Sequence, residues 1–149
     1  MSVRLLHFPA LFGFFEHPYE EGSVNTSRNI LIVDDNADQC DILANLVAEI
    51  GHKAYTATDG QMALQMFQER KIDLVITDIK MPRMDGMTLL ERIRQRDPDV
   101  RVIVITGFPS SETILRTIEN DGYTYLVKPV KLKSMANLIE KAFSDPLEG

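Results

Sequence analysis

Short apolar runs alternate with segments of helical spacing along most of the chain, and this alternation restricts its fold more than any other feature. The runs lie at 30–33, 74–76, 102–105 and 125–127, and a weaker one at 53–58 has the composition of a less buried edge strand. Runs this short and rich in Ile and Val are typical of strands that are buried on both faces of a parallel sheet. The sequence therefore predicts an α/β fold, in which a doubly wound, five-stranded parallel sheet carries helices on both faces.

Apolar residues at helical spacing fill the intervals between the runs. These segments lie near 43–50, 62–67, 89–93, 114–118 and 135–142. Strand and helix thus alternate five times, which fits one domain with a substantial core.

Polar side chains follow the apolar runs at the points where the predicted strands end. Asp34 and Asp35 follow the first run, Asp78 comes shortly after the run at 74–76, and Thr106 and Lys128 follow the last two. Because the carboxyl ends of parallel strands meet at the same edge of a sheet, these side chains should converge on one crevice. We expect three carboxylates, a hydroxyl group and an ammonium group to meet there.

This set of groups indicates phosphate chemistry that depends on a metal ion. Neighbouring carboxylates repel one another unless a cation neutralises them. Oxygen ligands without nearby His or Cys suit Mg²⁺ better than zinc, and Mg²⁺ completes its octahedron with waters and phosphate oxygens. A lysine adds a positive charge on the same phosphate, and one carboxylate remains free to act as a nucleophile that forms an aspartyl phosphate.

The ordered set of motifs resembles the receiver domains of two-component response regulators, the CheY-like family, over residues 29–145. The resemblance rests on Ile-Leu-Ile-Val-Asp-Asp at 30–35, Asp78 with Met81-Pro82 and Asp85-Gly86 after it, Ile-Thr-Gly at 105–107, and Lys128-Pro129. It implies a flavodoxin-like sheet with strand order 2-1-3-4-5 and a cis peptide bond between Lys128 and Pro129. Residues 1–28 would then form an N-terminal extension with a linker, and residues 146–149 a tail.

The resemblance also implies roles for the residues of the predicted site. Asp78 would accept the phosphoryl group. Asp34 and Asp35 would hold Mg²⁺ together with Asp78 and the backbone carbonyl of Lys80. Lys128 would contact the phosphoryl oxygens.

A switch and its partners are implied in the same way. Thr106 would contact the phosphoryl oxygens, and Tyr125 matches the aromatic switch residue of the family. Together they would alter the face made by the helix at 111–120, the strand at 123–127 and the helix at 131–143. The implied partners are a sensor histidine kinase or phosphotransfer protein and an unknown downstream protein on this face, with a phosphorylation-dependent homodimer as a further form of output.

Composition limits the partners and the location. With 22 acidic and 16 basic residues, the net charge of -6 offers no basic surface for nucleic acid. The single cysteine, Cys40, excludes an internal disulfide, and a reducing cytoplasm is the expected location. A chain of 149 residues holds one domain and little more, so we expect a stand-alone regulator without an output domain.

Several residues near the predicted site also have structural explanations. Asp38 and Asp41 could extend the acidic site, but acidic residues are favoured at a helix N-terminus, and we prefer that role. Cys40 shares a helical stripe with apolar residues, which favours packing over redox chemistry. For Asp85 we prefer a helix N-cap or turn over a fourth metal ligand. Phe108 is bulky enough to shield an acyl phosphate from water, and the sequence leaves this open.

Residues 1–28 differ in composition from the rest of the chain. Four of the seven Phe lie at 8–15, and a polar stretch that reads as a linker follows. The apolar part is far too short to span a bilayer, so no stable membrane insertion is expected. Three explanations stay open: a disordered or wrongly started N-terminus, a segment that docks on a partner or on its own domain, and contact with a membrane surface.

Two other functions compete with a phosphorylation switch. A Mg²⁺-dependent phosphatase of the haloacid dehalogenase type needs Asp-x-Asp after the first strand, but here that strand ends in Asp34-Asp35-Asn36. A degenerate receiver that acts only as a binding module would normally have lost the acceptor Asp, the Lys or one acid of the pair, and all are present. The expected protein is therefore not a conventional enzyme, because it would catalyse only its own phosphorylation and dephosphorylation.

Overall fold

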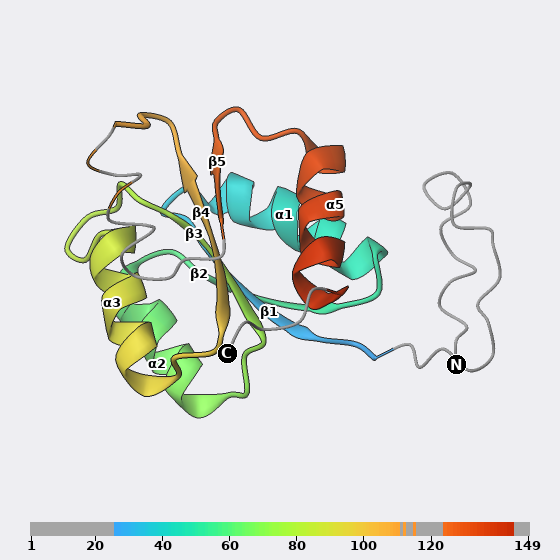
Figure 1. Ribbon diagram of the computed structural model, residues 1–149, viewed down its shortest axis with the longest axis horizontal. Coiled ribbons are helices and arrows are strands. Elements are labelled where there is room, and N and C mark those ends of the chain that lie inside the picture. The colour runs from blue at the N-terminus through green and yellow to red at the C-terminus, as the bar shows by residue number, and fades with distance from the viewer. Residues whose placement is uncertain (1–25, 111, 113–114, 116–123, 145–149) are drawn as a thin grey trace, which may run out of the picture.

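Five strands and four helices make up the part of the chain that the computed structural model describes, residues 26–110, 112, 115 and 124–144 (Figure 1). The strands are β1 (Asn29–Val33), β2 (Lys53–Ala57), β3 (Leu74–Asp78), β4 (Arg101–Thr106) and β5 (Thr124–Val127). The helices are α1 (Ala37–Glu49), α2 (Gly60–Glu69), α3 (Gly86–Arg96) and α5 (Leu132–Ser144). The helix expected at 111–120 falls almost entirely outside the described residues, as do the predictions for the N-terminal extension before Thr26 and for the tail.

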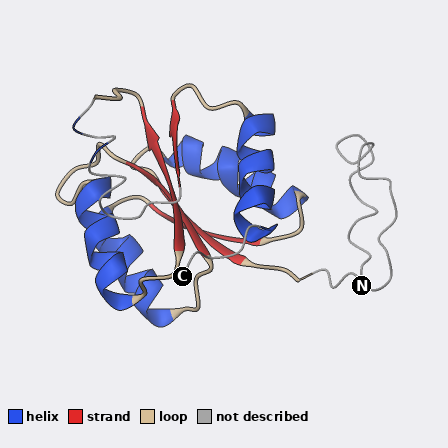
Figure 2. Cartoon of the chain, in the orientation of Figure 1, coloured by secondary structure: helices blue, strands red, loops and turns tan. Residues whose placement is uncertain are grey.

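The strands form one parallel sheet in the order β2-β1-β3-β4-β5, which confirms the predicted topology. Helices α1 and α5 cover one face and α2 and α3 the other, as Figures 1 and 2 show. The outer strands β2 and β5 are less buried than the three central ones, so the weak apolar pattern at 53–58 did mark an edge strand. Among the described residues, none of the helices combines the length and the apolar character that a membrane crossing requires.

Alternation along each strand creates two separate cores. In β1, Ile30 and Ile32 pack in the cluster that includes residues of α1 and α5, whereas Leu31 and Val33 pack in the cluster that includes residues of α2 and α3. Side chains that follow one another in a strand point to opposite faces, and both faces of this sheet are covered by helices. This is the physical reason that the central strands read as uninterrupted apolar runs.

The helices on either side of the crevice begin at polar caps. The side chain of Asn36 accepts hydrogen bonds from the backbone N–H groups of Asp38 and Gln39 at the start of α1. Asp38 lies in the first turn, as expected, but Asp41 lies beyond it and the cap itself was missed. Asp85 caps α3 by accepting from the N–H of Thr88 at 2.8 Å, which confirms the structural explanation preferred for it.

Candidate functional site

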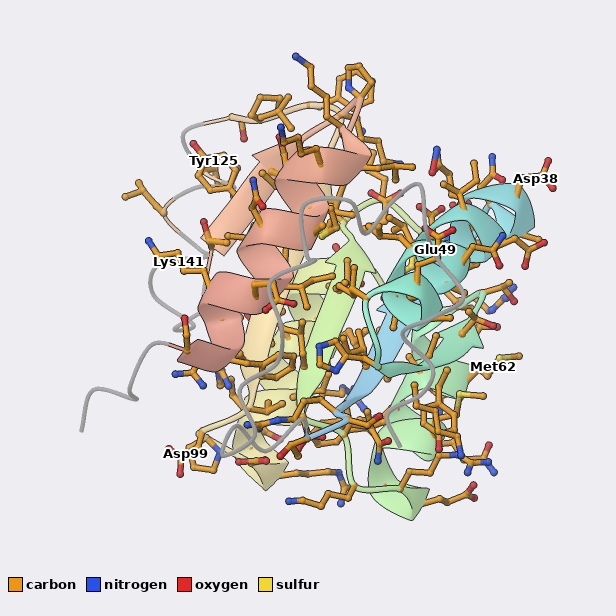
Figure 3. The ribbon with its side chains drawn as sticks, turned by 90° about the vertical axis from the view of Figure 1, so that its right-hand side faces the viewer. Asp38, Glu49, Met62, Asp99, Tyr125 and Lys141 are labelled. Carbon is orange, nitrogen blue, oxygen red and sulfur yellow. The ribbon has the colours of Figure 1, made fainter. Side chains whose placement is uncertain are left out.

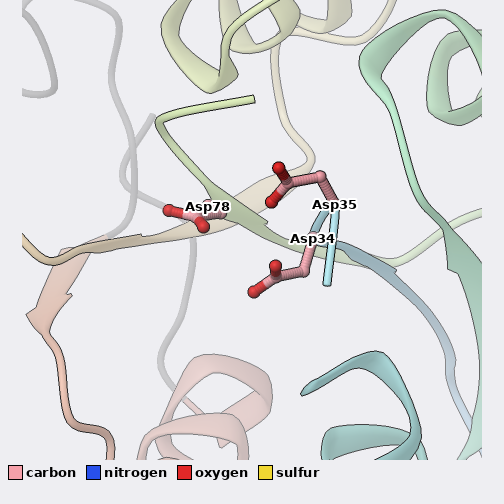
Figure 4. Close-up of side chains that lie close together, drawn as sticks. All are labelled: Asp34, Asp35 and Asp78. Carbon is pink, nitrogen blue, oxygen red and sulfur yellow. The ribbon is translucent and has the colours of Figure 1, made fainter. Parts of the chain in front are cut away.

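Three carboxylates meet at the carboxyl edge of the sheet (Figure 4). Asp34 and Asp35 follow β1, Asp78 ends β3, and each offers an oxygen within 4.8 Å of the others. Asp34 and Asp78 are buried and Asp35 is exposed, so the cluster opens to solvent on one side. The sequence predicted that these three carboxylates converge. In the structure they do so because β1 and β3 are parallel neighbours in the sheet.

Lys128 brings a positive charge to the same cluster. Its Nζ donates to Asp78 Oδ2 at 2.8 Å and lies 3.7 Å from Asp34 Oδ2. Lys128 follows β5, its backbone N–H donates to the carbonyl of Thr106 at 2.8 Å, and the peptide bond to Pro129 is cis, as the family resemblance implied. The predicted lysine therefore reaches the acidic cluster from two strands away.

Burial and charge act in opposite directions on the ionisable groups of the cluster. Burial raises the pKa of Asp34, a hydrogen bond from the Asn36 N–H lowers it, and the Asp78 charge raises it again, with a net upward shift. Burial alone would lower the pKa of Lys128, but the hydrogen bond to Asp78 and the two carboxylate charges hold it above its usual value. Lys128 therefore stays charged beside the carboxylates.

Backbone groups of Ile79 and Gly86 fix the position of Asp78. Its Oδ1 accepts the N–H of Ile79 at 2.7 Å, which leaves Oδ2 toward Lys128. Gly86, the first residue of α3, lies directly against the Asp78 main chain, and a Cβ there would be 2.1 Å from the Asp78 carbonyl oxygen. Only glycine allows α3 to begin so close to the main chain at the end of β3.

Thr106 and Tyr125 lie on β4 and β5, outside the acidic cluster. Thr106 ends β4, is buried, and its Oγ1 accepts the N–H of Phe108 at 3.0 Å. Tyr125 in β5 is half-buried against the core that faces α2 and α3, and Figure 3 shows it on the opposite side of the view from α1. Both lie on the strands expected for them, and their roles in a switch stay predictions.

Two loops approach each other across the mouth of the site. Lys80 and Phe108 follow β3 and β4, and the Lys80 Nζ lies 4.8 Å from the centre of the Phe108 ring. Phe108 itself is 70% exposed, so the ring lies over the surface and does not fill a pocket. The sequence singled out both positions but not their contact.

The donor groups fit a magnesium ion. Asp35, Ile79, Lys80, Met81, Pro82 and Asp85 line a depression on the open side of the cluster. The three clustered Asp residues offer carboxylate oxygens, which are the hard donors that Mg²⁺ prefers. Asp34, Asp35 and Asp78 are therefore the residues that would hold the ion, and Lys80 lines the same depression as Asp35.

A doubly wound parallel sheet with acids and a lysine at its carboxyl edge defines the CheY-like class of proteins. Residues 30–140 match the family described as response regulator receiver domain. The transcriptional regulatory protein ZraR of Escherichia coli O157:H7 is 34% identical over 116 residues, which cover 78% of this chain and 26% of ZraR. The chain therefore belongs to the response regulator receiver domain family.

Solved structures agree with this assignment. The signal receiver domain of an HD domain-containing protein from Pseudomonas fluorescens Pf-5 superposes with a TM-score of 0.76 at 33% identity, covering 80% of this chain and 96% of that one. CheY from Borrelia burgdorferi, solved as a CheX-CheY-BeF3-Mg complex, gives a TM-score of 0.74 at 30% identity, with 78% and 89% covered. By contrast, the aligned region spans only about a quarter of ZraR.

Proposed function

We propose that the chain is a phosphorylation-activated signalling switch that accepts a phosphoryl group on Asp78 in a Mg²⁺-dependent reaction. One observation carries the proposal: Asp78 Oδ2 lies 2.8 Å from the Lys128 Nζ, while the carboxylates of Asp34 and Asp35 lie alongside. A nucleophilic carboxylate, a fixed cation and two further metal-type ligands form the set that phosphoryl transfer to Asp needs.

The phosphodonor is a phosphohistidine on a sensor histidine kinase or phosphotransfer protein. An Asp78 oxygen attacks the phosphorus, the P–N bond breaks, and its electron pair stays on the imidazole, which takes up a proton from solvent. The product is an aspartyl phosphate. Water later attacks the phosphorus, and inorganic phosphate leaves while the Asp78 carboxylate is regenerated. The chain thus catalyses only its own phosphorylation and dephosphorylation.

Each neighbouring residue has one task in this reaction. Asp34 and Asp35 bind Mg²⁺ together with Asp78 and the Lys80 carbonyl, and the bound ion supplies positive charge for the phosphoryl oxygens. Lys128 contacts one of these oxygens, for which its position beside Asp78 is suited. Thr106 contacts another with its hydroxyl group.

The output is a change in partner binding. When the Thr106 hydroxyl turns toward the phosphoryl group, Tyr125 turns inward and alters the surface of β5, α5 and the segment at 111–120. A downstream protein, or a second phosphorylated copy of the chain, binds this surface. We place the reaction in the cytoplasm, where histidine kinases present their phosphorylated domains.

The experiment is to treat the protein with acetyl phosphate and Mg²⁺ and to measure its intact mass. The unaltered chain should gain one phosphoryl group and Asp78→Asn should gain none. Asp41→Asn is the matched control, because it makes the same chemical change at an exposed position on α1 and should be labelled normally. Labelling of Asp78→Asn at the wild-type level would show that another residue is the acceptor.

A further inference from the structure

The loop between β3 and α3, residues 79–85, forms one wall of the site. It carries Lys80 and lines the depression beside Asp35. Backbone hydrogen bonds fix its ends, since the Gly86 N–H donates to the Ile79 carbonyl at 2.8 Å and the Ile79 N–H donates to Ile105 at 3.2 Å. The position of the loop tip therefore depends on other contacts.

The tip of this loop adopts a backbone conformation that is costly for its residue. Arg83 has a φ of 68°, and among the described residues it is the only non-glycine with positive φ. Next to it, the Met84 N–H donates to the Pro82 carbonyl at 2.8 Å, and the Met84 side chain is buried. A residue kept in this conformation needs surroundings that hold it there.

Asp59, the residue before α2, supplies such a contact. Its Oδ1 accepts the Met62 N–H at 2.8 Å and so caps the helix, while its Oδ2 accepts from Arg83 Nη2 at 3.1 Å. The Met62 hydrogen bond, helped by Arg83, holds the pKa of Asp59 below its usual value. One carboxylate thus joins the start of α2 to the tip of the loop, across 24 positions of sequence.

Close packing supports the same connection. A Cβ on Gly60, the first residue of α2, would lie 2.9 Å from the Met84 Cβ, so the loop lies directly against the helix. Helix α2 can therefore hold the loop in place through both contacts. The sequence contains an Asp before a helical segment and an Arg beside Pro82, but no sequence pattern indicates that the two form an ion pair.

We propose that the Asp59–Arg83 ion pair is a positioning device for the metal site. It holds the 79–85 loop so that the Lys80 carbonyl faces Mg²⁺, and it raises the affinity for the ion without touching it. The inference rests on the proposed function, because it assumes that Mg²⁺ binds beside Asp34, Asp35 and Asp78.

The test is the Mg²⁺ dissociation constant of the full chain, measured by titration calorimetry for Arg83→Asn. Asn tolerates positive φ, so the variant removes the ion pair without adding backbone strain. Simple electrostatics predicts tighter binding, because a positive charge is lost near a cation site. If the ion pair positions the loop, its loss should instead weaken Mg²⁺ binding. The expected increase in the dissociation constant is about two- to fivefold, because exposed ion pairs contribute free energies of that size.

Three further variants make the result specific. Lys71→Asn loses the same charge from an ion pair with Asp73 whose side chains are 83% and 20% exposed, against 69% and 20% for Arg83 and Asp59, and it should not weaken Mg²⁺ binding. Arg83→Lys keeps the charge and should restore most of the affinity. Asp59→Asn keeps the helix cap and should weaken binding, and combining it with Arg83→Asn should add less than the sum of the two effects.

Melting temperatures measured without Mg²⁺ distinguish a loss of loop positioning from a general loss of stability. Each variant should melt at a temperature close to that of the unaltered chain. Unchanged or tighter Mg²⁺ binding by Arg83→Asn would overturn the inference while leaving the proposed function intact. Equal weakening by Lys71→Asn would also overturn it. If the unaltered chain itself failed to bind Mg²⁺, both the inference and the metal role in the proposed function would fall.

Discussion

Asp34 and Asp78 are the same residue type at the ends of neighbouring strands, but their surroundings differ. Asp78 receives hydrogen bonds from the Ile79 N–H and from Lys128, and it is 6% exposed. Asp34 receives the Asn36 N–H and is only 3% exposed. Both carboxylates are buried, so we expect their hydrogen-bond partners, above all the contact between Asp78 and Lys128, to divide the roles between identical side chains.

Substitutions of Asp35 and Lys128 should separate metal binding from phosphoryl transfer. Asp35→Ala removes an exposed ligand and should weaken Mg²⁺ binding and phosphorylation together. Lys128→Ala removes a cation that lies 3.7 Å from Asp34, so Mg²⁺ should bind as well as before or more tightly while phosphorylation slows. Calorimetry and labelling by acetyl phosphate measure the two quantities, and a large loss of Mg²⁺ affinity in Lys128→Ala would contradict the assignment.

His52, at the end of the sheet remote from the site, should make stability depend on pH. Its Nδ1 accepts the Arg28 N–H at 3.1 Å. Burial, followed by the Arg28 charge, lowers its pKa from 6.5 to about 4 despite the opposing charge of Asp73. The folded state therefore takes up a proton on His52 less readily than the unfolded state does. The contribution of neutral His52 to the free energy of unfolding is complete above pH 6.5, falls as the pH drops, and is lost below about pH 4.

Urea unfolding at two pH values measures this effect. Between pH 7 and pH 5 the free energy of unfolding should fall by about 1–2 kcal/mol, after allowance for the partial exposure of the ring. In His52→Gln most of this pH dependence should disappear. A variant that kept the full dependence would show that other groups are responsible.

At the scale of elements, sequence patterns located the strands well and the contacts between loops poorly. The run at 102–105 became β4 because a buried parallel strand needs apolar residues on both faces, which a linear sequence displays directly. The acids at 34 and 78 converged because strand ends in a parallel sheet share an edge. The pairs Asp59–Arg83 and Lys80–Phe108 join loops whose paths depend on turn geometry, and short-range patterns carry little information about it.

The end of α1 offers a clean test of backbone geometry. Gly51 has a φ of 95°, its N–H donates to Ala48, and the next N–H, of His52, donates to Val47, which is a Schellman motif. A Cβ at Gly51 would meet nothing within 4 Å, so Gly51→Ala probes conformation alone. We expect a loss of about 1 kcal/mol in the free energy of unfolding.

Gly107→Ala is the matched control for Gly51→Ala. A Cβ at Gly107 would lie 3.9 Å from the Lys128 side chain, which is an ordinary contact, and its φ is not positive. Stability should stay the same or rise by up to about 1 kcal/mol because the unfolded chain loses freedom. Denaturant titration compares the two variants, and equal destabilisation would contradict the backbone explanation.

At the scale of the whole molecule, the chemistry and the proposed output surface lie on different parts of one sheet. Asp78 is on the central strand β3, whereas Tyr125 is on the edge strand β5, with β4 between them. Ladder hydrogen bonds join the three strands, and Thr106 at the end of β4 pairs in register with Val127. Any signal from the site to the edge can therefore pass through β4 and the loop that follows it.

Beryllofluoride, a mimic of the acyl phosphate, should reveal whether a change at Asp78 reaches β5. In NMR spectra of the full chain with Mg²⁺, amide signals of Gly107 and of β5 should shift along with those beside Asp78, because a ligand that favours one state changes all regions that differ between the states. Asp78→Asn with the same additions is the control and should show neither set of shifts. Shifts confined to residues next to the three carboxylates would indicate a phosphate acceptor without a switch.

Cys40 is a natural reporter of how often helix α1 moves away from the strands beside the acidic cluster. It is the single thiol of the chain, it is 3% exposed, and its Sγ donates to the Asp34 carbonyl at 3.3 Å and to the Ala57 carbonyl at 3.7 Å. A thiol reagent can reach it only when α1 lifts away from β1 and β2, so the labelling rate measures the frequency of that opening. A ligand that holds Asp34 in place should slow this opening, so the occupancy of the cluster becomes measurable as a rate of thiol modification at a residue that the chain already contains.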